Sequence, residues 1–420
     1  MELLRNGRPR VVITGMGAIT ALGGVKTLWE GLKSGTSGIR RIETIPIEHV
    51  PVKIGGEVRG FDSSEYIEHK EARRMGRASQ FALVGAQLAA QDAGLTQPEI
   101  EAEGDRVGVV MGTTLGSHEM GDQSTNKYRD SGYKRPNPLG LINSLPNMPG
   151  HYISKFFKTF GPLMATATAC AAGTQSVGEA TEMIRNGRAD MLFTGGVESV
   201  FQDYAIAGFE AMDALATGYN ENPSAASRPF DKDRNGFVYS EGCAVLVVES
   251  LAHALKRGAR IYAEILGHAA SSDAYHIAAL DPAAGGATRS MKWALQDAHV
   301  ATEEIQYINA HGTSTQSNDA METLAIKKVF GEQAYNIPVS SSKSMLGHAL
   351  GASGAIEIIA CVMSLVDQVI HPTINYTTPD PDCDLDYVPN VARDARGLKT
   401  VLSNSFGLGG QNATIILRKL

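Results

Sequence analysis

The sequence predicts an α/β protein built from two similar halves. Its 420 residues exceed the length that one hydrophobic core usually serves, and 43% of them are hydrophobic, so we expect two domains or a large fused pair. Most of its 45 glycines stand where an apolar, strand-like run passes into a helical run. This alternation is typical of sheets covered by helices. The order of predicted strands and helices repeats on either side of Gly258.

The first half opens on an apolar run that ends in glycine, which predicts a strand at 11–14. Similar runs and helical spacings predict, in order, helices at 24–33 and 76–93 and strands at 106–111, 190–194 and 243–249. Segment 117–148 is rich in Asn, Ser, Pro and Gly. We therefore expect it to be irregular and to wrap over a second subunit or line a pocket.

The second half repeats this alternation after a predicted helix at 250–257. The expected strands are 261–268, 305–310, 337–341 and 400–402, and the expected helices are 286–298, 319–329 and 353–367. The helix at 319–329 follows a polar start with acidic residues in its first turn, which favours a helix N-terminus.

Cys170 stands in a run of small residues, 165–173, between a predicted strand and a predicted helix. Apolar residues recur at helical spacing after it, at Val177, Ala180, Met183 and Ile184. A thiol at a helix N-terminus meets backbone N–H groups and the positive end of the helix dipole. We therefore expect a lowered thiol pKa, although a cysteine among alanines is more often a small core residue.

Three further polar residues follow two predicted strands of the second half. His311 comes directly after 305–310, while Lys343 and His348 come after 337–341. The ends of strands in α/β proteins are where such folds place their chemistry. The sequence therefore predicts a site that combines a thiol, two imidazoles and an ammonium group.

These residues lie in motifs that resemble the β-ketoacyl-[acyl-carrier-protein] synthases, most closely the elongating Cys-His-His class, synthase I/II. The motifs are T-A-C-A-A-G at Cys170, N-A-H-G-T-S-T at His311, K-S-M-L-G-H-A-L-G-A-S-G at Lys343 and His348, and N-S-F-G-L-G-G-Q-N at 404–412. The resemblance implies a thiolase-like five-layered αβαβα fold made of two duplicated halves. Residues 1–257 would carry the nucleophile, and residues 258–420 would carry both catalytic histidines and the lysine.

The resemblance also implies an acyltransferase that condenses malonyl carrier protein with an acyl group on Cys170 in fatty acid elongation, with loss of CO2. Neutral His311 and His348 would donate hydrogen bonds to the thioester oxygen, each accepting a backbone N–H at its other nitrogen. A charged Lys343 would orient His311 and an adjacent carboxylate. The expected carboxylates are Glu322 and Asp319.

Other positions take their expected roles from the same resemblance. The N–H groups of Cys170 and Leu408 would form an oxyanion hole, next to Phe406. Leu408 stands where the family usually has a gating phenylalanine, so acyl-chain selectivity is expected to differ. The expected substrate-binding residues are Thr313 and Thr315, for the pantetheine arm, and Leu115, for the acyl pocket.

Composition and charge narrow the range of partners. A net charge of −7 gives no reason to expect nucleic acid. The basic group Lys70, Arg73, Arg74 and Arg77 lies on a helix predicted at 68–93. The resemblance implies that the first three dock an acyl- or malonyl-loaded acyl carrier protein, that Asp213 replaces another basic contact, and that the chain forms a homodimer.

Cysteine usage and hydropathy predict a cytoplasmic protein without a cofactor. The four cysteines form no Cys-x-x-Cys pair, so neither a metal site nor a disulfide framework is expected. The sequence contains no uninterrupted run of eighteen apolar residues and no secretory apolar core at its start, so a membrane span is not expected.

Several alternatives share parts of this pattern. A ketosynthase of a type II polyketide pathway has the same catalytic residues, and a non-catalytic chain-length partner subunit typically lacks the cysteine. A thiolase or a priming synthase would differ at His348. The segment 231–236 resembles the start of a calcium loop, but its twelfth position is Gly242 rather than Glu. Gly15-Met16-Gly17 resembles a dinucleotide-binding fingerprint that lacks its third glycine.

Overall fold

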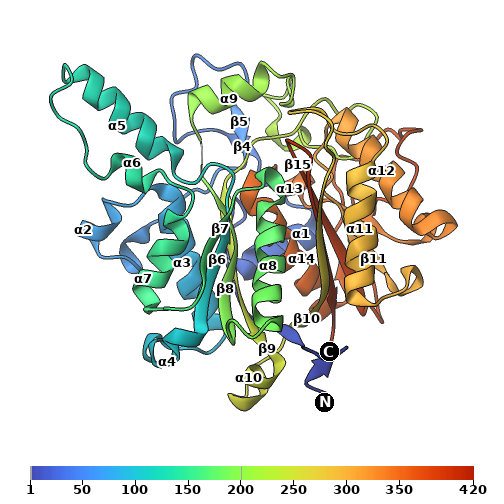
Figure 1. The fold of residues 1–420 in the computed structure, drawn as a ribbon. Coiled ribbons are helices and arrows are strands. Elements are labelled where there is room, and N and C mark those ends of the chain that lie inside the picture. Colours follow the sequence, from blue (N-terminus) through green and yellow to red (C-terminus); the bar gives the residue numbers. More distant parts are fainter. Residues whose placement is uncertain (1, 200) are drawn as a thin grey trace.

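A ten-stranded mixed sheet forms the centre of the molecule, with helices on both sides (Figure 1). The computed structural model describes residues 2–199 and 201–420. The strands of the first half are β3 (Val11–Ile19), β6 (Val107–Gly112), β7 (Leu163–Thr166), β8 (Met191–Glu198) and β9 (Gly242–Ser250). Those of the second half are β10 (Ala263–Ser272), β11 (Tyr307–Asn309), β12 (Val339–Ser340), β15 (Thr400–Gly407) and β16 (Gln411–Arg418).

The two halves arrange their strands in the same order. The first half runs β3-β9-β8-β6-β7 and the second runs β10-β16-β15-β11-β12, so each half follows the order first, fifth, fourth, second, third. The halves meet where β3 and β10 pair antiparallel, with Val12 opposite Glu264. The two sheets expected from the sequence are therefore joined edge to edge into one continuous sheet.

Helices form three layers around the two halves of this sheet (Figure 1). The middle layer consists of α8 (Ala172–Arg185) and α14 (Ser353–Asp367), which pack against each other and against strands of both halves. The outer layers consist of α3 (Arg77–Asp92) and α7 (Met148–Phe157) on one side and α11 (Gly285–Ala298) and α12 (Gln316–Phe330) on the other. This is the thiolase-like five-layered arrangement.

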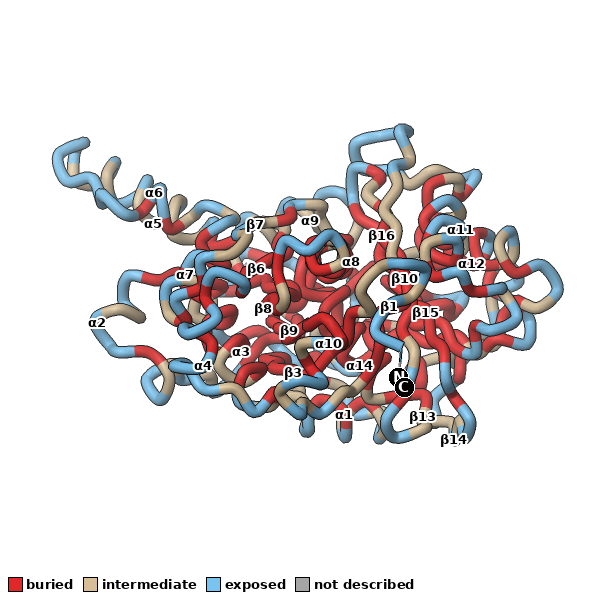
Figure 2. Tube along the Cα trace, turned by 60° about the horizontal axis from the view of Figure 1, so that its bottom comes forward, coloured by how far each residue is buried: buried red, intermediate tan, exposed pale blue. Residues whose placement is uncertain are grey.

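The helices of the middle layer are deeply buried. Figure 2 shows buried chain through the central strands and helices, and exposed chain mainly at the periphery. The segment Leu350–Asp367 has a mean hydropathy of 1.7 and is long enough to cross a membrane, but 83% of it is buried inside the fold. Its apolar character is that of a core helix, because most of its residues pack inside the fold.

Glycines in β3 let a helix approach the sheet closely. A Cβ at Gly17 would lie 2.1 Å from the backbone oxygen of Gly85 in α3, and one at Gly15 would lie 2.3 Å from that of Ala89. Both glycines lie inside a strand that continues to Ile19, rather than in a turn. They therefore serve helix packing, and the resemblance to a dinucleotide fingerprint is not supported.

Three sequence-based expectations about elements are wrong. The longer helix predicted at 68–93 for the basic group is interrupted, since α2 (His69–Ala72) ends before α3 begins at Arg77, whereas α3 confirms the helix predicted at 76–93. Segment 117–148 is largely helical, with α5 (His118–Asp130) and α6 (Gly140–Asn143) forming a projection from the body in Figure 2. The strand predicted at 400–402 extends to Gly407, because polar residues occupy a fully buried strand.

Smaller elements complete the chain. They are β1 (Leu4–Arg5), β2 (Arg8–Pro9), α1 (Val25–Ser34), β4 (Arg40–Arg41), β5 (Ile54–Gly55), α4 (Gln97–Ala102), α9 (Asp203–Glu210), α10 (Leu251–Lys256), α13 (Lys343–Leu346), β13 (Val369–Ile370) and β14 (Arg393–Asp394). The link between α10 and β10 contains Gly258, where the sequence pattern divides.

Candidate active site

Cys170 lies in a tight turn between β7 and α8. The turn is a short 3-10 helix, Ala169–Ala171, and α8 begins at Ala172. Ala169 has a positive φ of 49°, a left-handed conformation that is strained for a residue with a Cβ. The turn directs a thiol that is only 5% exposed toward the second half of the molecule.

His311 follows β11, and a buried carboxylate shapes the loop that carries it. The backbone N–H groups of His311 and Gly312 donate to Glu322 of α12, at 2.9 and 2.8 Å. Burial raises the pKa of Glu322 to about 7, although these two hydrogen bonds oppose the shift. Glu322 therefore positions the backbone of the histidine loop.

Lys343 begins α13 and reaches both an imidazole and a carboxylate. Its ammonium lies 3.4 Å from Nδ1 of His311 and forms an ion pair with Glu357 of α14. The expectation that Glu322 or Asp319 pairs with Lys343 is therefore wrong. Asp319 accepts the N–H of Phe230 at 2.8 Å and lies 3.5 Å from Arg234.

Sequence reasoning missed Glu357, although a signal was present. It is the only charged residue between 350 and 366, a stretch that is otherwise apolar or small. A carboxylate buried in such a helix requires a cation or hydrogen-bond donors. A search for the partner of the buried Lys343 could have found it.

His348 completes the group. Its Nδ1 lies 3.0 Å from the hydroxyl of Ser353, the first residue of α14. Its Nε2 is buried without a hydrogen-bond partner among the described residues. The rings of His311 and His348 meet edge to face, with centroids 5.3 Å apart. The partners of both rings are thus side chains rather than the backbone N–H groups expected.

The thiol and the two imidazoles converge. One nitrogen of each ring and the sulfur of Cys170 all lie within 4.8 Å of one another. Burial lowers the pKa of His311 and of His348 well below the usual value, and the charge of Lys343 adds to both shifts. Both rings are therefore neutral. The ammonium of Lys343 at Nδ1 of His311 places the proton of that ring on Nε2, and the Ser353 hydroxyl at Nδ1 of His348 is able to donate and so allows the same tautomer there.

The expected low pKa of the thiol is not found. Burial raises the pKa of Cys170 to about 11, while Lys343 and the N–H groups of Leu408 and Cys170 itself pull it down. Desolvation of the thiolate outweighs these favourable groups. The thiol is therefore protonated at neutral pH.

A cavity of about 730 Å³ connects these groups to the surface. The hydroxyls of Thr313 and Thr315 lie 2.9 Å apart in its wall. Leu408 is 38% exposed at the wall, whereas Phe406 is buried with its ring 5.8 Å from that of His311. Leu115 does not line this cavity but packs in the apolar cluster that contains Cys170.

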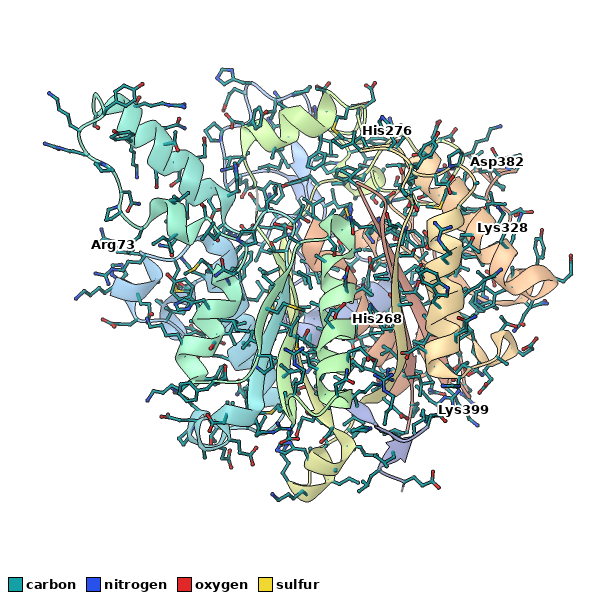
Figure 3. The ribbon with its side chains drawn as sticks, in the orientation of Figure 1. Arg73, His268, His276, Lys328, Asp382 and Lys399 are labelled. Carbon is teal, nitrogen blue, oxygen red and sulfur yellow. The ribbon has the colours of Figure 1, made fainter. Side chains whose placement is uncertain are left out.

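The predicted basic group lies elsewhere and is smaller than expected. Lys70, Arg73 and Arg74 are exposed on α2 and the turn after it. Arg77 is not part of an open surface, because it pairs with Glu241 at 2.9 Å and lies over the ring of Phe81. Figure 3 shows Arg73 far from His276, which lines the cavity, at opposite sides of the molecule's upper half.

The segment that resembles a calcium loop is a structural turn. Asp231 accepts the N–H groups of Thr377 and Thr378 at 2.6 and 2.7 Å and pairs with Arg228 at 3.1 Å. Arg234 fills the space beside it and pairs with Asp380. Guanidinium groups thus occupy the position that a cation would take.

A thiol and two imidazoles are also a donor set that suits zinc. Here the ammonium of Lys343 faces Nδ1 of His311, so the proton of that ring stays on Nε2. A protonated nitrogen cannot bind a metal. The arrangement therefore suits hydrogen-bond donation to a substrate oxygen better than metal binding.

Comparisons with known proteins agree with this geometry. The family model described as "Beta-ketoacyl synthase, N-terminal domain" matches residues 8–254, and the one described as "Beta-ketoacyl synthase, C-terminal domain" matches residues 262–377. Proteins named 3-oxoacyl-[acyl-carrier-protein] synthase 2 are 44% identical in Synechocystis sp. and 45% identical in Staphylococcus aureus. Each match covers 98% of both chains.

Solved structures of ketosynthases are similar over almost the whole chain. A type II PKS acyl-carrier protein in complex with its ketosynthase bound to the hexaketide (AntDE:AntF) gives a TM-score of 0.89 at 37% identity, covering 98% of this chain and 100% of that chain. A β-ketoacyl synthase from Burkholderia phymatum gives a TM-score of 0.90 at 36% identity with the same coverage. With its thiolase-like fold, its thiol and imidazoles in contact and both family models matched, this chain belongs to the β-ketoacyl synthase family of acyltransferases.

Proposed function

We propose that the chain is a 3-oxoacyl-[acyl-carrier-protein] synthase that lengthens an acyl group by condensation with malonyl carrier protein. The observation that carries this proposal is the convergence of Cys170, His311 and His348 at the end of a deep cavity. Curated relatives of that name, 44–45% identical over nearly the whole chain, support the same conclusion.

In the first half-reaction, the sulfur of Cys170 attacks the thioester carbonyl of an acyl carrier protein. A bond forms between sulfur and the acyl carbon, the carrier thiol leaves, and the proton of Cys170 passes to that leaving sulfur. The N–H groups of Cys170 and Leu408 stabilise the oxyanion of the tetrahedral intermediate. Their proximity to the sulfur of Cys170 supports this assignment.

In the second half-reaction, a malonyl thioester takes the place of the departed carrier arm. His311 and His348 donate Nε2–H to its thioester oxygen, which gains negative charge as CO2 leaves. The resulting enolate carbon attacks the acyl-cysteine carbonyl, and the Cys170 thiolate departs and takes a proton from solvent water, which replaces the one lost with the first carrier thiol. Neutral imidazoles suit this task because they act as hydrogen-bond donors without needing to give up a proton.

Lys343 orients His311 and stabilises the thiolate form of Cys170. Glu357 holds the ammonium, and Glu322 and Asp319 support the loop and helix around His311. Thr313 and Thr315 bind the pantetheine arm at the cavity wall, and Leu115, which packs outside this cavity in the apolar cluster with Cys170, contacts the acyl chain. Leu408 and Phe406 form the turn at the cavity wall.

An acyl carrier protein is the proposed partner, docked by the exposed Lys70, Arg73 and Arg74. The net charge of −7 makes this local basic group important for an acidic partner. One of the similar ketosynthases of known structure is in complex with an acyl-carrier protein. We place the enzyme in the cytoplasm, where its thiol stays reduced, with residues 1–257 and 258–420 as its two halves.

The proposal includes a homodimer formed along β7. This strand ends the sheet and pairs with β6 on one side only. Leu163 in β7 is 46% exposed. Pairing of β7 with its copy would cover an open sheet edge, which otherwise invites aggregation.

A ketosynthase of a polyketide pathway is the second candidate. It is favoured by the similarity to a ketosynthase bound to a hexaketide, at 37% identity. The higher identity to synthase 2 proteins favours fatty acid elongation. A non-catalytic chain-length partner is disfavoured, because Cys170 is present in the site.

The test is a reaction with acyl carrier protein and labelled malonyl carrier protein. Wild-type enzyme should carry one acyl group on Cys170, release labelled CO2 and form a 3-oxoacyl product. Cys170→Ala should lose condensation, and His348→Ala should still be acylated while CO2 release falls about 100- to 1000-fold. His299→Asn, on the exposed end of α11, is the matched control and should act as wild type. Wild-type levels of product from Cys170→Ala would refute the proposal.

A further inference from the structure

Glu198, the last residue of β8, is a buried carboxylate without a cation partner. Its side chain is fully buried, and no ion pair to it is found in the described parts of the chain. Burying a charged group without a counter-ion is costly unless hydrogen bonds compensate. The hydrogen-bond donors around Glu198 therefore indicate its role.

The carboxylate joins two loops that are far apart in the sequence. It accepts the N–H groups of Thr114 at 2.7 Å and Leu115 at 3.1 Å, and the hydroxyl of Thr113 at 3.2 Å. It also accepts the N–H of Gly351 at 3.1 Å. One oxygen bridges both loops, since Thr114 and Gly351 donate to the same atom.

These two loops lead to different groups of the proposed site. The first follows β6 and carries Leu115, which packs in the apolar cluster with Cys170. The second is the 3-10 turn Leu350–Ala352, which lies between His348 and the first residue of α14. That first residue is Ser353, whose hydroxyl contacts Nδ1 of His348.

The two loops are also in direct contact, so neither can move toward the other. A Cβ at Gly351 would lie 2.6 Å from the backbone nitrogen of Thr114. Leu350 has a positive φ of 42°, which is strained for a leucine. A displacement of either loop would therefore shift Leu115 on one side or Ser353 and His348 on the other.

We propose that Glu198 is a positioning residue of this site, which sets the distance between the loop that carries Leu115 and the segment that carries His348. This inference rests on the proposed function. Glu198 acts through the backbone of both loops and through Ser353, without touching the reacting atoms. Burial raises the pKa of Glu198 itself, and its ionised form raises the pKa of Cys170, which Lys343 lowers.

Two substitutions separate the two effects. Glu198→Gln keeps the size but removes the charge and one strong acceptor. Glu198→Asp keeps the charge but is shorter by one methylene group, so it cannot hold both loops. Glu249→Gln is the matched control, because Glu249 is equally buried but pairs with Arg257 at the far end of β9.

The experiment measures malonyl decarboxylation and the pH dependence of Cys170 alkylation by iodoacetamide. Both Glu198 variants should lower kcat of decarboxylation about 10- to 100-fold with KM little changed, as expected for misplaced catalytic groups. Glu198→Gln should also move the alkylation profile to lower pH, with about tenfold faster alkylation for each unit that the pKa falls. Glu198→Asp should leave that profile in place.

The result that overturns the inference is a pair of Glu198 variants that match Glu249→Gln in kcat and in alkylation profile. If Glu198→Gln does not fold, Glu198→Asp alone carries the kcat test. Alkylation of Cys170 does not require turnover. It therefore still tests the effect of Glu198 on the thiol if the proposed function is refuted. A wild-type protein that releases no CO2 would refute the proposed function, and a wild-type-like alkylation profile of Glu198→Gln would refute the charge effect.

Discussion

At the scale of single residues, Cys170 is protonated at rest because burial dominates its environment. The sequence showed a thiol beside a helix and suggested an ionised group. The sequence indicates that a helix begins after Cys170, and therefore that a helix dipole is present. It does not indicate how deeply the thiol is buried, because that depends on how the two halves pack around the turn. The thiol pKa of about 11 is the product of that closure.

The charge of Lys343 should be visible in thiol reactivity. Lys343→Met removes a group that lowers the pKa of Cys170, so the thiolate fraction at any pH below the pKa must fall. We expect alkylation of Cys170 to be slower than in wild type at pH 8 and to need a higher pH for the same rate. Mass spectrometry of the labelled peptide measures this, and the buried Cys243, Cys361 and Cys383 are internal controls. A faster reaction would contradict the assigned role of Lys343.

The leucine at the cavity wall should set acyl selectivity. Leu408 is partly exposed and flexible, whereas phenylalanine is larger and flat. Leu408→Phe should change the preferred acyl length with turnover of the best substrate kept within about tenfold, since the proposed donor at this position is a backbone N–H. Product profiles with carrier proteins of different acyl lengths test this. An unchanged profile would count against a role of Leu408 in selectivity.

At the scale of elements, small residues decide where helices can lie on the sheet. Gly17→Ala would place a Cβ 2.1 Å from the backbone oxygen of Gly85 in α3. The backbone of a packed helix cannot move aside as the end of a flexible side chain can. We expect a loss of about 1–3 kcal/mol in the free energy of unfolding. Gly208→Ala in α9 is the control, since nothing lies within 4 Å of its added Cβ. Urea unfolding measures both, and equal stabilities would contradict this account of β3.

Helices and strands are predictable from the sequence where burial produces a clear pattern of apolar residues, and poorly predictable where it does not. The strands at 190–194 and 243–249 and the helix at 353–367 were recognisable because their apolar runs are continuous. Helix α5 has no buried residue, so no apolar stripe marks it, and its turn-forming residues suggested irregular structure. The break between α2 and α3 carries neither proline nor a turn motif, and tertiary packing of Met75 and Gly76 decides it.

The candidate site was predictable in its main residues but not in its supporting contacts. Motifs named Cys170, His311, Lys343 and His348, since each follows a strand in a recognisable turn. Pairing partners such as Glu357 depend on how α13 and α14 meet, which no local pattern records. For the same reason the backbone role of Glu322 emerged only from the folded chain.

At the scale of the whole molecule, the free edge of the sheet predicts self-association. The carbonyl oxygens of Pro162 and Thr166 accept hydrogen bonds from the β6 side, so residues 162, 164 and 166 face β6 and the N–H of Leu163 faces outward. Leu163→Pro should therefore weaken a dimer formed through β7 without breaking the pairing with β6. Light scattering coupled to gel filtration should show monomers for this variant and dimers for wild type and Leu163→Thr. A dimer that survives Leu163→Pro would place the interface elsewhere.

The repeated strand order has a consequence for how the two halves share the chemistry. In each half, the third strand leads through a 3-10 turn into a helix of the middle layer: β7 leads through Ala169–Ala171 to α8, and β12 leads through α13 and then Leu350–Ala352 to α14. One copy of this scaffold bears the sulfur, and the other bears the ammonium and an imidazole at the equivalent place. The chemistry therefore depends on the packing of the two halves against each other, since neither connection carries the sulfur and the imidazoles together.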